Sequence, residues 1–206
     1  MKKFLAEVVG TFALVLCGTG AIVVNQHTNG AITHLGISIA FGLIVTLMIY
    51  AFGKISGAHM NPAVTIAFAI NKNFRWKDVS PYIIAQIIGA LLASFVLKLT
   101  FPANELLGTT LPVGSAMQSF FLELLLTFIL MVVIFVSPSK LEAIAIGLTV
   151  GLEAYFAGPI CGASMNPARS IGPALISGHC EFLWLYIFAP IIGAILAVFV
   201  NKLKRK

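Results

Sequence analysis

Six apolar runs, each long enough to cross a membrane, divide the sequence. A transmembrane helix needs about 20 mostly apolar residues, because the hydrocarbon core is about 30 Å thick and an α-helix rises about 1.5 Å per residue. The runs are Phe4–Val24, Leu35–Phe52, Tyr82–Phe101, Met117–Val136, Leu141–Ala157 and Leu183–Val200. Short joints separate them, among them Asn25–His34, Lys72–Pro81, Pro102–Ser115 and Ser137–Lys140. The pattern predicts an all-α membrane protein with six transmembrane helices.

Composition supports this class and excludes others. The chain is 59% hydrophobic and 10% charged, whereas soluble domains carry about 25% charged residues. It therefore cannot cover a water-facing surface. Three cysteines in 206 residues are too few, and odd in number, for a disulfide scaffold, and they show no metal-ligand spacing. No joint is long enough to separate two domains, so we expect a single channel domain over 1–206 and no nucleic-acid partner, despite a net charge of +6.

The cations predict the orientation. If the spans alternate in direction, 11 of the 13 Lys and Arg residues fall on one side of the membrane, and Lys98 and Arg169 are the exceptions. The positive-inside rule then places both termini in the cytoplasm, with the protein in the plasma or inner membrane of the cell. Glu7 within the first run argues against a cleaved signal peptide, so we expect an uncleaved first span.

The sequence also repeats itself. A shift of 105 residues places Ile39–Ala63 on Ile144–Ala168 with 15 identities in 25 positions. A shift of 104 places Tyr82–Leu99 on Tyr186–Leu203 with 13 identities in 18. Shared hydrophobicity alone does not align Asn-Pro-Ala and tyrosines at a nearly constant offset.

Each copy, approximately 4–101 and 117–203, contains three spans. Because three is an odd number, the second copy enters the membrane from the opposite side, which makes a two-fold inverted repeat. Glu7 and Glu123 occupy matching Glu-x-x-x-Thr-Phe segments of the two copies. In such folds the functional site lies near the midplane, where the copies meet.

The segment most clearly repeated is Gly57–Ala63, which returns as Gly162–Ala168. Asn61 and Asn166 are favoured helix N-caps, and proline is favoured at the first helical position. The residues predicted to begin the two helices are Pro62 and Ala63, and Pro167 and Ala168. The apolar stretches that follow, Val64–Ile70 and Ser170–Ile176, are too short to span a membrane. We therefore expect two re-entrant half-helices, one from each face.

Such half-helices would point their N-termini at each other near the midplane. Each N-terminus carries about +0.5 elementary charge, so the pair repels cations. The side chains of Asn61 and Asn166 would offer N–H donors there. A water molecule that accepts from both cannot accept a proton from its neighbour, so a proton relay breaks at that point. This predicts a channel selective for small neutral molecules.

These motifs resemble the aquaporin, or major intrinsic protein, family over essentially the whole chain. SGAHMNPAV and GASMNPARS carry the resemblance, and FAGPICGASMNPARS is similar to the nodulin-like intrinsic proteins, some of which carry glycerol or uncharged metalloid acids. The resemblance implies six tilted helices, two half-helices and a homotetramer with one pore per subunit.

The resemblance also implies a four-residue selectivity filter. By spacing from the two asparagines, its positions are Phe41, Ala154, Ala163 and Arg169. Strict water channels typically have histidine at the position of Ala154, so two alanines suggest a wider opening. Arg169 would repel cations, and Phe41 could face the carbon side of a polyol.

Other positions matched to the family give a mixed indication of the solute. Ser170 and Ala174 match the water-channel pattern, where glycerol facilitators commonly have Asp and Lys. Tyr186 resembles a water channel and Ile187 a glycerol channel. The favoured function is a passive water channel that also admits glycerol and other small uncharged solutes. The alternative is a glycerol or uncharged-metalloid facilitator in which water is secondary.

Several polar residues lie within or beside the apolar runs. We expect Glu7 and Glu123 to support the half-helices by accepting hydrogen bonds from the non-helical backbone before them, rather than to face lipid. His59 either lines the pore or braces the loop. Glu153 could contact a neighbouring helix or subunit, and Cys161 lies near the pore mouth, where thiol reagents could reach it.

Two other function classes fit less well. An intramembrane enzyme needs a nucleophile with a base, or a metal cluster, and His59, Cys161 and the two distant glutamates form no such set. An ion-coupled transporter needs titratable groups at the midplane, where this chain has asparagines. We therefore expect no enzyme activity and no cofactor, and as partners water, small neutral solutes and the lipid bilayer.

Overall fold

The computed structural model describes residues 1–204. Arg205 and Lys206, counted above among the cytoplasmic cations, lie outside the described residues. The α-helices are α1 (Lys2–Leu14), α2 (Gly20–His27), α3 (Thr33–Ser56), α4 (Pro62–Ile70), α5 (Trp76–Thr100), α6 (Ala116–Val136), α7 (Glu142–Cys161), α8 (Pro167–Ser177) and α9 (Leu183–Lys204). A π-helical turn, Val15–Thr19, joins α1 to α2. Residues 1–204 contain no strand, so the predicted all-α class is confirmed.

Six helices are long and apolar enough to cross a membrane, as predicted. Their ends differ from the apolar runs where polar residues or prolines lie inside a helix. The joint predicted at Lys72–Pro81 is wrong after Arg75, because α5 begins at Trp76 and continues through Pro81. The carbonyl that Pro81 leaves without an intrahelical partner is that of Lys77, an exposed residue, where water can bind it.

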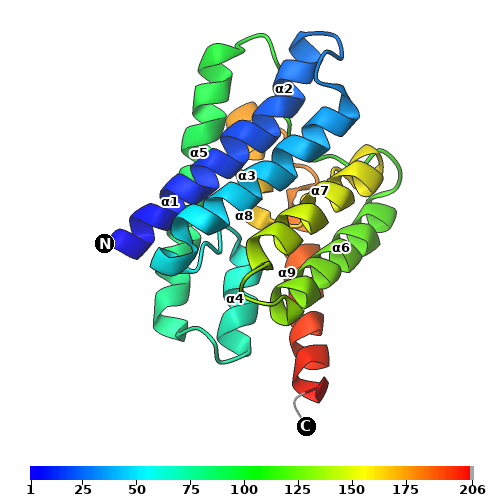
Figure 1. Ribbon diagram of the computed structural model, residues 1–206. Coiled ribbons are helices and arrows are strands. Elements are labelled where there is room, and N and C mark those ends of the chain that lie inside the picture. The colour runs from blue at the N-terminus through cyan, green and yellow to red at the C-terminus, as the bar shows by residue number, and fades with distance from the viewer. Residues whose placement is uncertain (205–206) are drawn as a thin grey trace.

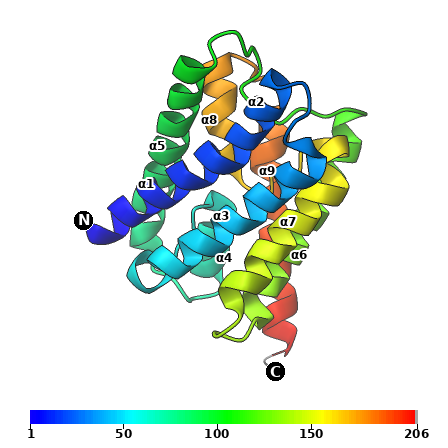
Figure 2. The ribbon, with the colours of Figure 1, turned by 45° about the horizontal axis from the view of Figure 1, so that its top comes forward.

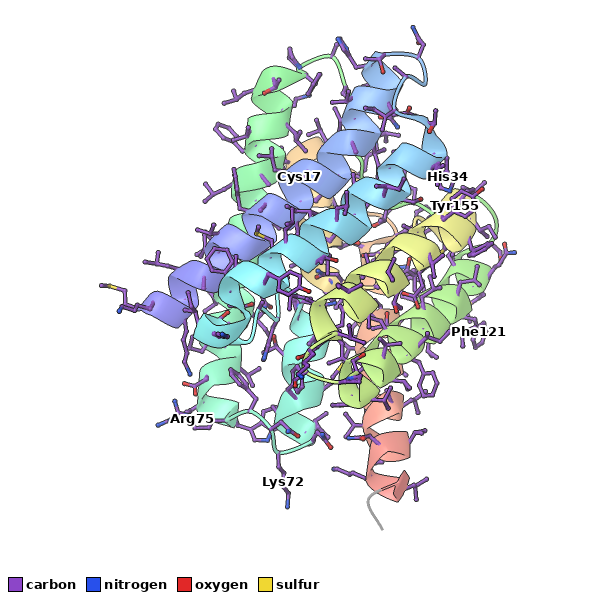
Figure 3. The ribbon with its side chains drawn as sticks, viewed as in Figure 1. Cys17, His34, Lys72, Arg75, Phe121 and Tyr155 are labelled. Carbon is purple, nitrogen blue, oxygen red and sulfur yellow. The ribbon has the colours of Figure 1, made fainter. Side chains whose placement is uncertain are left out.

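The fifth span shows the same effect at its other end. We predicted that it ends at Ala157, but α7 continues through Pro159 to Cys161. Pro159 cannot donate to the carbonyl of Tyr155, four residues earlier. Nε2 of His34 donates to that carbonyl instead, at 2.7 Å, and the two rings stack with centroids 5.3 Å apart. This contact joins α3 to α7, and Figure 3 shows both side chains between the two helices.

The two halves of the chain interlock. Within each half the first span packs along the last, α1 on α5 and α6 on α9, while α3 packs on α7 between the halves. Each half-helix packs against the last span of the other half, α4 on α9 and α8 on α5 (Figures 1 and 2). Small residues allow the first and last spans of each half to approach closely: a Cβ at Gly89 of α5 would overlap the Val8 carbonyl of α1, and one at Gly193 of α9 the Leu124 carbonyl of α6.

The bundle has an apolar exterior and polar groups in its interior. Large apolar side chains such as Phe121 and Phe156 are 62% and 71% exposed, and Figure 3 shows Phe121 directed away from α6. The side chains of Glu7, Gln86 and Glu123 are instead fully buried. Such a distribution suits a lipid environment around the helices and a polar site between them.

Candidate functional site

The two half-helices begin in the same way. Asn61 and Asn166 have extended backbone conformations and cap α4 and α8, with proline at the first helical position. Oδ1 of Asn61 accepts from the backbone N–H of Ala63 at 2.9 Å, and Oδ1 of Asn166 accepts from that of Ala168 at 3.0 Å. Oδ1 of Asn166 also accepts from the N–H of Arg169 at 3.4 Å. The asparagines thus satisfy one N–H group of α4 and two of α8 that the helix N-termini would leave free.

The same asparagines connect the two halves. Nδ2 of Asn61 donates to the carbonyl oxygen of Met165 at 2.7 Å, and Nδ2 of Asn166 donates to that of Met60 at 2.8 Å. An amide nitrogen carries two hydrogens, so each asparagine keeps a second N–H. Both residues line one cavity, which we call the central cavity.

The loops that lead into the half-helices have strained backbones. Four non-glycine residues there have positive φ angles: Ala58 (46°), Met60 (48°), Ala163 (41°) and Met165 (53°). A non-glycine residue rarely adopts this left-handed region, so surrounding contacts must hold these loops. The equivalence of the four positions shows that the repeat extends to the backbone.

Two buried carboxylates make those contacts. Glu7 accepts hydrogen bonds from the backbone N–H groups of His59 at 2.9 Å and Met60 at 2.7 Å. Glu123 accepts from those of Ser164 at 2.7 Å and Met165 at 2.8 Å. Neither carboxylate has any exposed surface. Each therefore binds the loop of its own half through charge-assisted hydrogen bonds, which are stronger than neutral ones.

Arg169 is 2% exposed and lies in the first turn of α8. Its Nη1 donates to the carbonyl oxygen of Gly108 at 2.9 Å, and its Cζ lies 5.4 Å from the centre of the Phe41 ring. Its Nε has no partner among the described residues. A guanidinium over an aromatic face gains cation–π energy, and it carries five N–H donors, of which the Gly108 carbonyl takes one.

The four residues matched to the family's filter line a second cavity, which we call the vestibule. Phe41, Ala163 and Arg169 also line the central cavity, whereas Ala154 lines only the vestibule. The three shared residues therefore stand where the two cavities meet, between the mouth formed by the loop after α5 and the tips of the half-helices.

Comparison with known proteins agrees with this geometry. The model of the major intrinsic protein family matches residues 1–201. The chain belongs to this family. Its members are channels, so the protein is a multi-pass membrane channel and not an enzyme.

Individual relatives resemble the chain over nearly its full length. Aquaporin NIP1-1 of Zea mays is 44% identical over 212 residues, covering 100% of this chain and 75% of the relative. Nodulin-26 of Glycine max is 42% identical, covering 100% and 78%. The X-ray structure of the aquaglyceroporin from Plasmodium falciparum superposes with a TM-score of 0.84 at 28% identity, covering 98% of this chain and 96% of that one. The resemblance to the family is thus confirmed.

His59 combines the two arrangements considered for it. The imidazole lines the central cavity. It is also held by aromatic rings, with centroids 4.9 Å from Phe68, 4.9 Å from Phe74 and 5.2 Å from Tyr82. Its Nδ1 lies 3.1 Å from Oγ1 of Thr65. His59 is therefore a fixed part of the cavity wall.

Two other residues behave differently from what the sequence suggests. Cys161 is fully buried and its Sγ donates to the Ala157 carbonyl at 3.5 Å, so the expectation that thiol reagents could reach it is wrong. Glu153 is 7% exposed, and neither carboxylate oxygen has a partner among the described residues. No contact within residues 1–204 thus satisfies the carboxyl group of Glu153.

Sequence reasoning missed the loop between α5 and α6 and the role of Gln86. The Gly108 carbonyl contacts Arg169, but a backbone carbonyl has no signature in the sequence. Gln86 donates through Nε2 to Glu7 at 2.8 Å and to Thr65 at 3.0 Å. Its signal was present, because a glutamine within an apolar span needs a buried partner.

Proposed function

We propose that the protein is a passive channel for water and for small uncharged solutes including glycerol, and that it excludes protons and other ions. The observation that supports this most directly is the meeting of two half-helix N-termini at one cavity, with Asn61 and Asn166 each retaining a free N–H. Water can accept hydrogen bonds from these donors, whereas a cation meets the positive ends of two helix dipoles.

We assign the roles as follows. Asn61 and Asn166 form the pore centre. Phe41, Ala154, Ala163 and Arg169 form the selectivity filter. The residues that support the half-helices are Pro62, Ala63, Pro167, Ala168, Glu7, Glu123 and His59. Burial of a full charge at Arg169 is costly unless the site uses it, and a fixed cation where the two cavities meet supports exclusion of cations.

The solute range follows from the filter. Ala154 and Ala163 place only methyl groups on the wall, and Phe41 provides an apolar face beside the donors of Arg169. Such a site suits a polyol, which has a carbon face and a hydroxyl face. These alanines and the structural similarity to an aquaglyceroporin favour a second candidate, a facilitator of glycerol or an uncharged metalloid acid with water secondary.

We also propose the surroundings of the channel. It would be one domain over 1–206, with repeats at approximately 4–101 and 117–203, assembled as a homotetramer. Both termini would face the cytoplasm of a plasma or inner membrane. Lys72 and Arg75 project at the end of the bundle where α9 ends (Figure 3), which supports that orientation. Protease access in oriented vesicles tests the orientation, and cross-linking in the membrane tests the tetramer.

A stopped-flow comparison in one proteoliposome preparation tests the function. Vesicles with the protein should shrink faster in hyperosmotic sucrose than empty vesicles, and should admit glycerol and a neutral metalloid acid faster as well. A much larger increase for glycerol than for water would favour the second candidate. No increase for any of the three would reject a channel.

A further inference from the structure

The two half-helices carry equivalent hydroxyls that have different partners. Thr65 in α4 and Ser170 in α8 are 105 residues apart, the offset of the repeat. Each is bonded to the residue six positions before it: Oγ1 of Thr65 lies 3.1 Å from Nδ1 of His59, and Oγ of Ser170 lies 2.6 Å from Oγ of Ser164. Both hydroxyls are fully buried, so each needs its hydrogen bonds from within the protein.

The second hydrogen-bond partners of Thr65 and Ser170 are not equivalent in the two halves. In the first half Gln86 of α5 donates to Thr65 at 3.0 Å. The equivalent of Gln86, 104 residues on, is Pro190 of α9, whose side chain can donate nothing. Ser170 is paired instead with Thr110, from the loop between α5 and α6, with the two Oγ atoms 2.7 Å apart. In the second half the loop thus takes the place that a transmembrane helix occupies in the first.

The same loop carries the partner of Arg169 in a strained conformation. Leu107 and Gly108 have consecutive positive φ angles of 49° and 68°. A leucine in this region costs energy, yet Leu107 is fully buried and its N–H is held by Oδ1 of Asn104 at 2.7 Å. In this conformation the Gly108 carbonyl accepts from Arg169.

We propose that Thr110 and Ser170 form a latch that docks this loop on α8 and so positions Arg169. Thr110 follows the accepting residue, Gly108, by two positions, and Ser170 directly follows the donating residue. Fixing one pair therefore fixes the other. Thr110 lines the vestibule, whereas Ser170 lines neither cavity, so an effect of Ser170 on solutes is indirect. The inference rests on the proposed channel function.

The surroundings of the latch make it the firmest attachment of the loop. Other attachments are more exposed: Thr109 meets Ser177 at 3.0 Å in a partly buried contact, and Asn104 donates to the exposed Gln26 at 2.9 Å. The latch pair is buried, and a Cβ on Gly162 would come within 3.1 Å of Cγ2 of Thr110. A hydrogen bond is costliest to break where water cannot replace it.

The test uses Thr110→Val and Ser170→Ala, which remove one hydroxyl each, and their conservative counterparts Thr110→Ser and Ser170→Thr. Control variants are Thr149→Val and Ser94→Ala, because each of these hydroxyls bonds the backbone of its own helix, at Ala145 and Ala90. Proteoliposomes report the ratio of glycerol to water permeability and the proton flux under an imposed potential. Hydrogen exchange reports the opening of residues 104–113.

We expect Thr110→Val and Ser170→Ala each to raise the glycerol-to-water ratio and the proton flux several-fold, and loop exchange by about tenfold, because each breaks the buried hydrogen bond that docks the loop on α8. The double variant should be no worse than Ser170→Ala alone, since that variant already breaks the Thr110–Ser170 bond together with the bond from Ser170 to Ser164. The conservative variants should restore the wild-type values, and the controls should match wild type.

Failure of the latch differs from failure of the channel. If the wild-type protein conducts no solute, the proposed function is rejected. If the wild type conducts but both hydroxyl deletions keep its permeability ratio and proton flux, only the latch is rejected. An unfolded Thr110→Val leaves Ser170→Ala to decide, and additive effects in the double variant would also overturn the latch.

Discussion

Asn61 and Asn166 each donate a hydrogen bond to the carbonyl of the residue that precedes the other, at 2.7 Å to Met165 and 2.8 Å to Met60. The two asparagines are therefore at once helix caps and cross-links. Their oxygens hold their own helices, and their nitrogens hold the opposite loop. The separation and direction of the two half-helix tips are thus fixed by side chains whose remaining N–H groups are the donors assigned to the pore centre.

Replacement by aspartate separates these two tasks. Asn61→Asp and Asn166→Asp keep the capping oxygen, which aspartate provides equally well. They lose the N–H donor, place an oxygen against a carbonyl oxygen, and set a negative charge where two helix dipoles contribute about +0.5 each. We expect potassium conductance to appear in proteoliposomes containing either variant.

Asn73→Asp serves as the control for added charge. Asn73 is exposed and its Oδ1 accepts from Asn71, a bond that aspartate keeps. This variant should stay impermeable to potassium. If the two pore-centre variants exclude potassium as fully as the wild type, the assignment of the donors is wrong.

The two buried glutamates should differ in their effect on stability. Glu7 accepts four hydrogen bonds, from Ser56, His59, Met60 and Gln86, whereas Glu123 accepts from Ser164 and Met165. Glutamine in either place sets an N–H₂ group against donors, at a cost on the order of 1–3 kcal/mol for each group left unsatisfied. Glu7→Gln should therefore lower the melting temperature in detergent more than Glu123→Gln. The reverse order would contradict the described network.

The position of Phe41 depends on a glycine. Gly18 lies in the π-helical turn of the first span, and a Cβ there would overlap the Phe41 ring. Gly18→Ala should push the ring toward the cavities that it lines and lower glycerol permeability several-fold, with a smaller effect on water. Stopped-flow light scattering measures both.

Gly53→Ala provides the matched control. It adds the same methyl group to α3, where the nearest atom is Cγ2 of Ile49 at an ordinary 3.7 Å. This variant should behave as wild type. Unchanged glycerol permeability in Gly18→Ala would contradict the assignment of Phe41 to the filter wall.

The native carboxyl of Glu153 should lower the stability of the folded protein relative to an apolar side chain of similar size. A buried carboxyl without partners has lost its hydration and gained no hydrogen bond. Glu153→Met, which is similar in size, should raise the melting temperature by roughly 2–8 °C in a chain of this length. The exposed Glu105 gives the control, since Glu105→Met removes a charge that is already hydrated. A lower melting temperature for Glu153→Met would indicate a partner such as a neighbouring subunit.

The local chemistry of the half-helices could be predicted from sequence. Asparagine followed by proline specifies a cap and a first helical residue, and the observed helices begin at Pro62 and Pro167. The spans were also predictable, because lipid demands continuous apolar surface. The helix ends were harder to predict. Helix α7 continues through Pro159 because His34, far away in the sequence, satisfies the freed carbonyl of Tyr155.

The residues that position Arg169 were not predictable. Its partner is a backbone carbonyl 61 residues away, in a loop predicted to be a simple joint. Thr110 carries no motif, and it becomes significant only when Pro190 is recognised as the equivalent of Gln86. Such asymmetry within a repeat cannot be interpreted until the contacts of both halves are known.

The central claim is that an aqueous path runs between the tips of two half-helices and interrupts proton transfer there. The most direct test measures water and proton flux in the same proteoliposomes, by osmotic shrinkage and by the response of an enclosed pH dye to an imposed potential. The account predicts shrinkage faster than in empty vesicles together with a proton flux equal to theirs. Shrinkage no faster than in empty vesicles, or a proton flux that rises with the water flux, would contradict it.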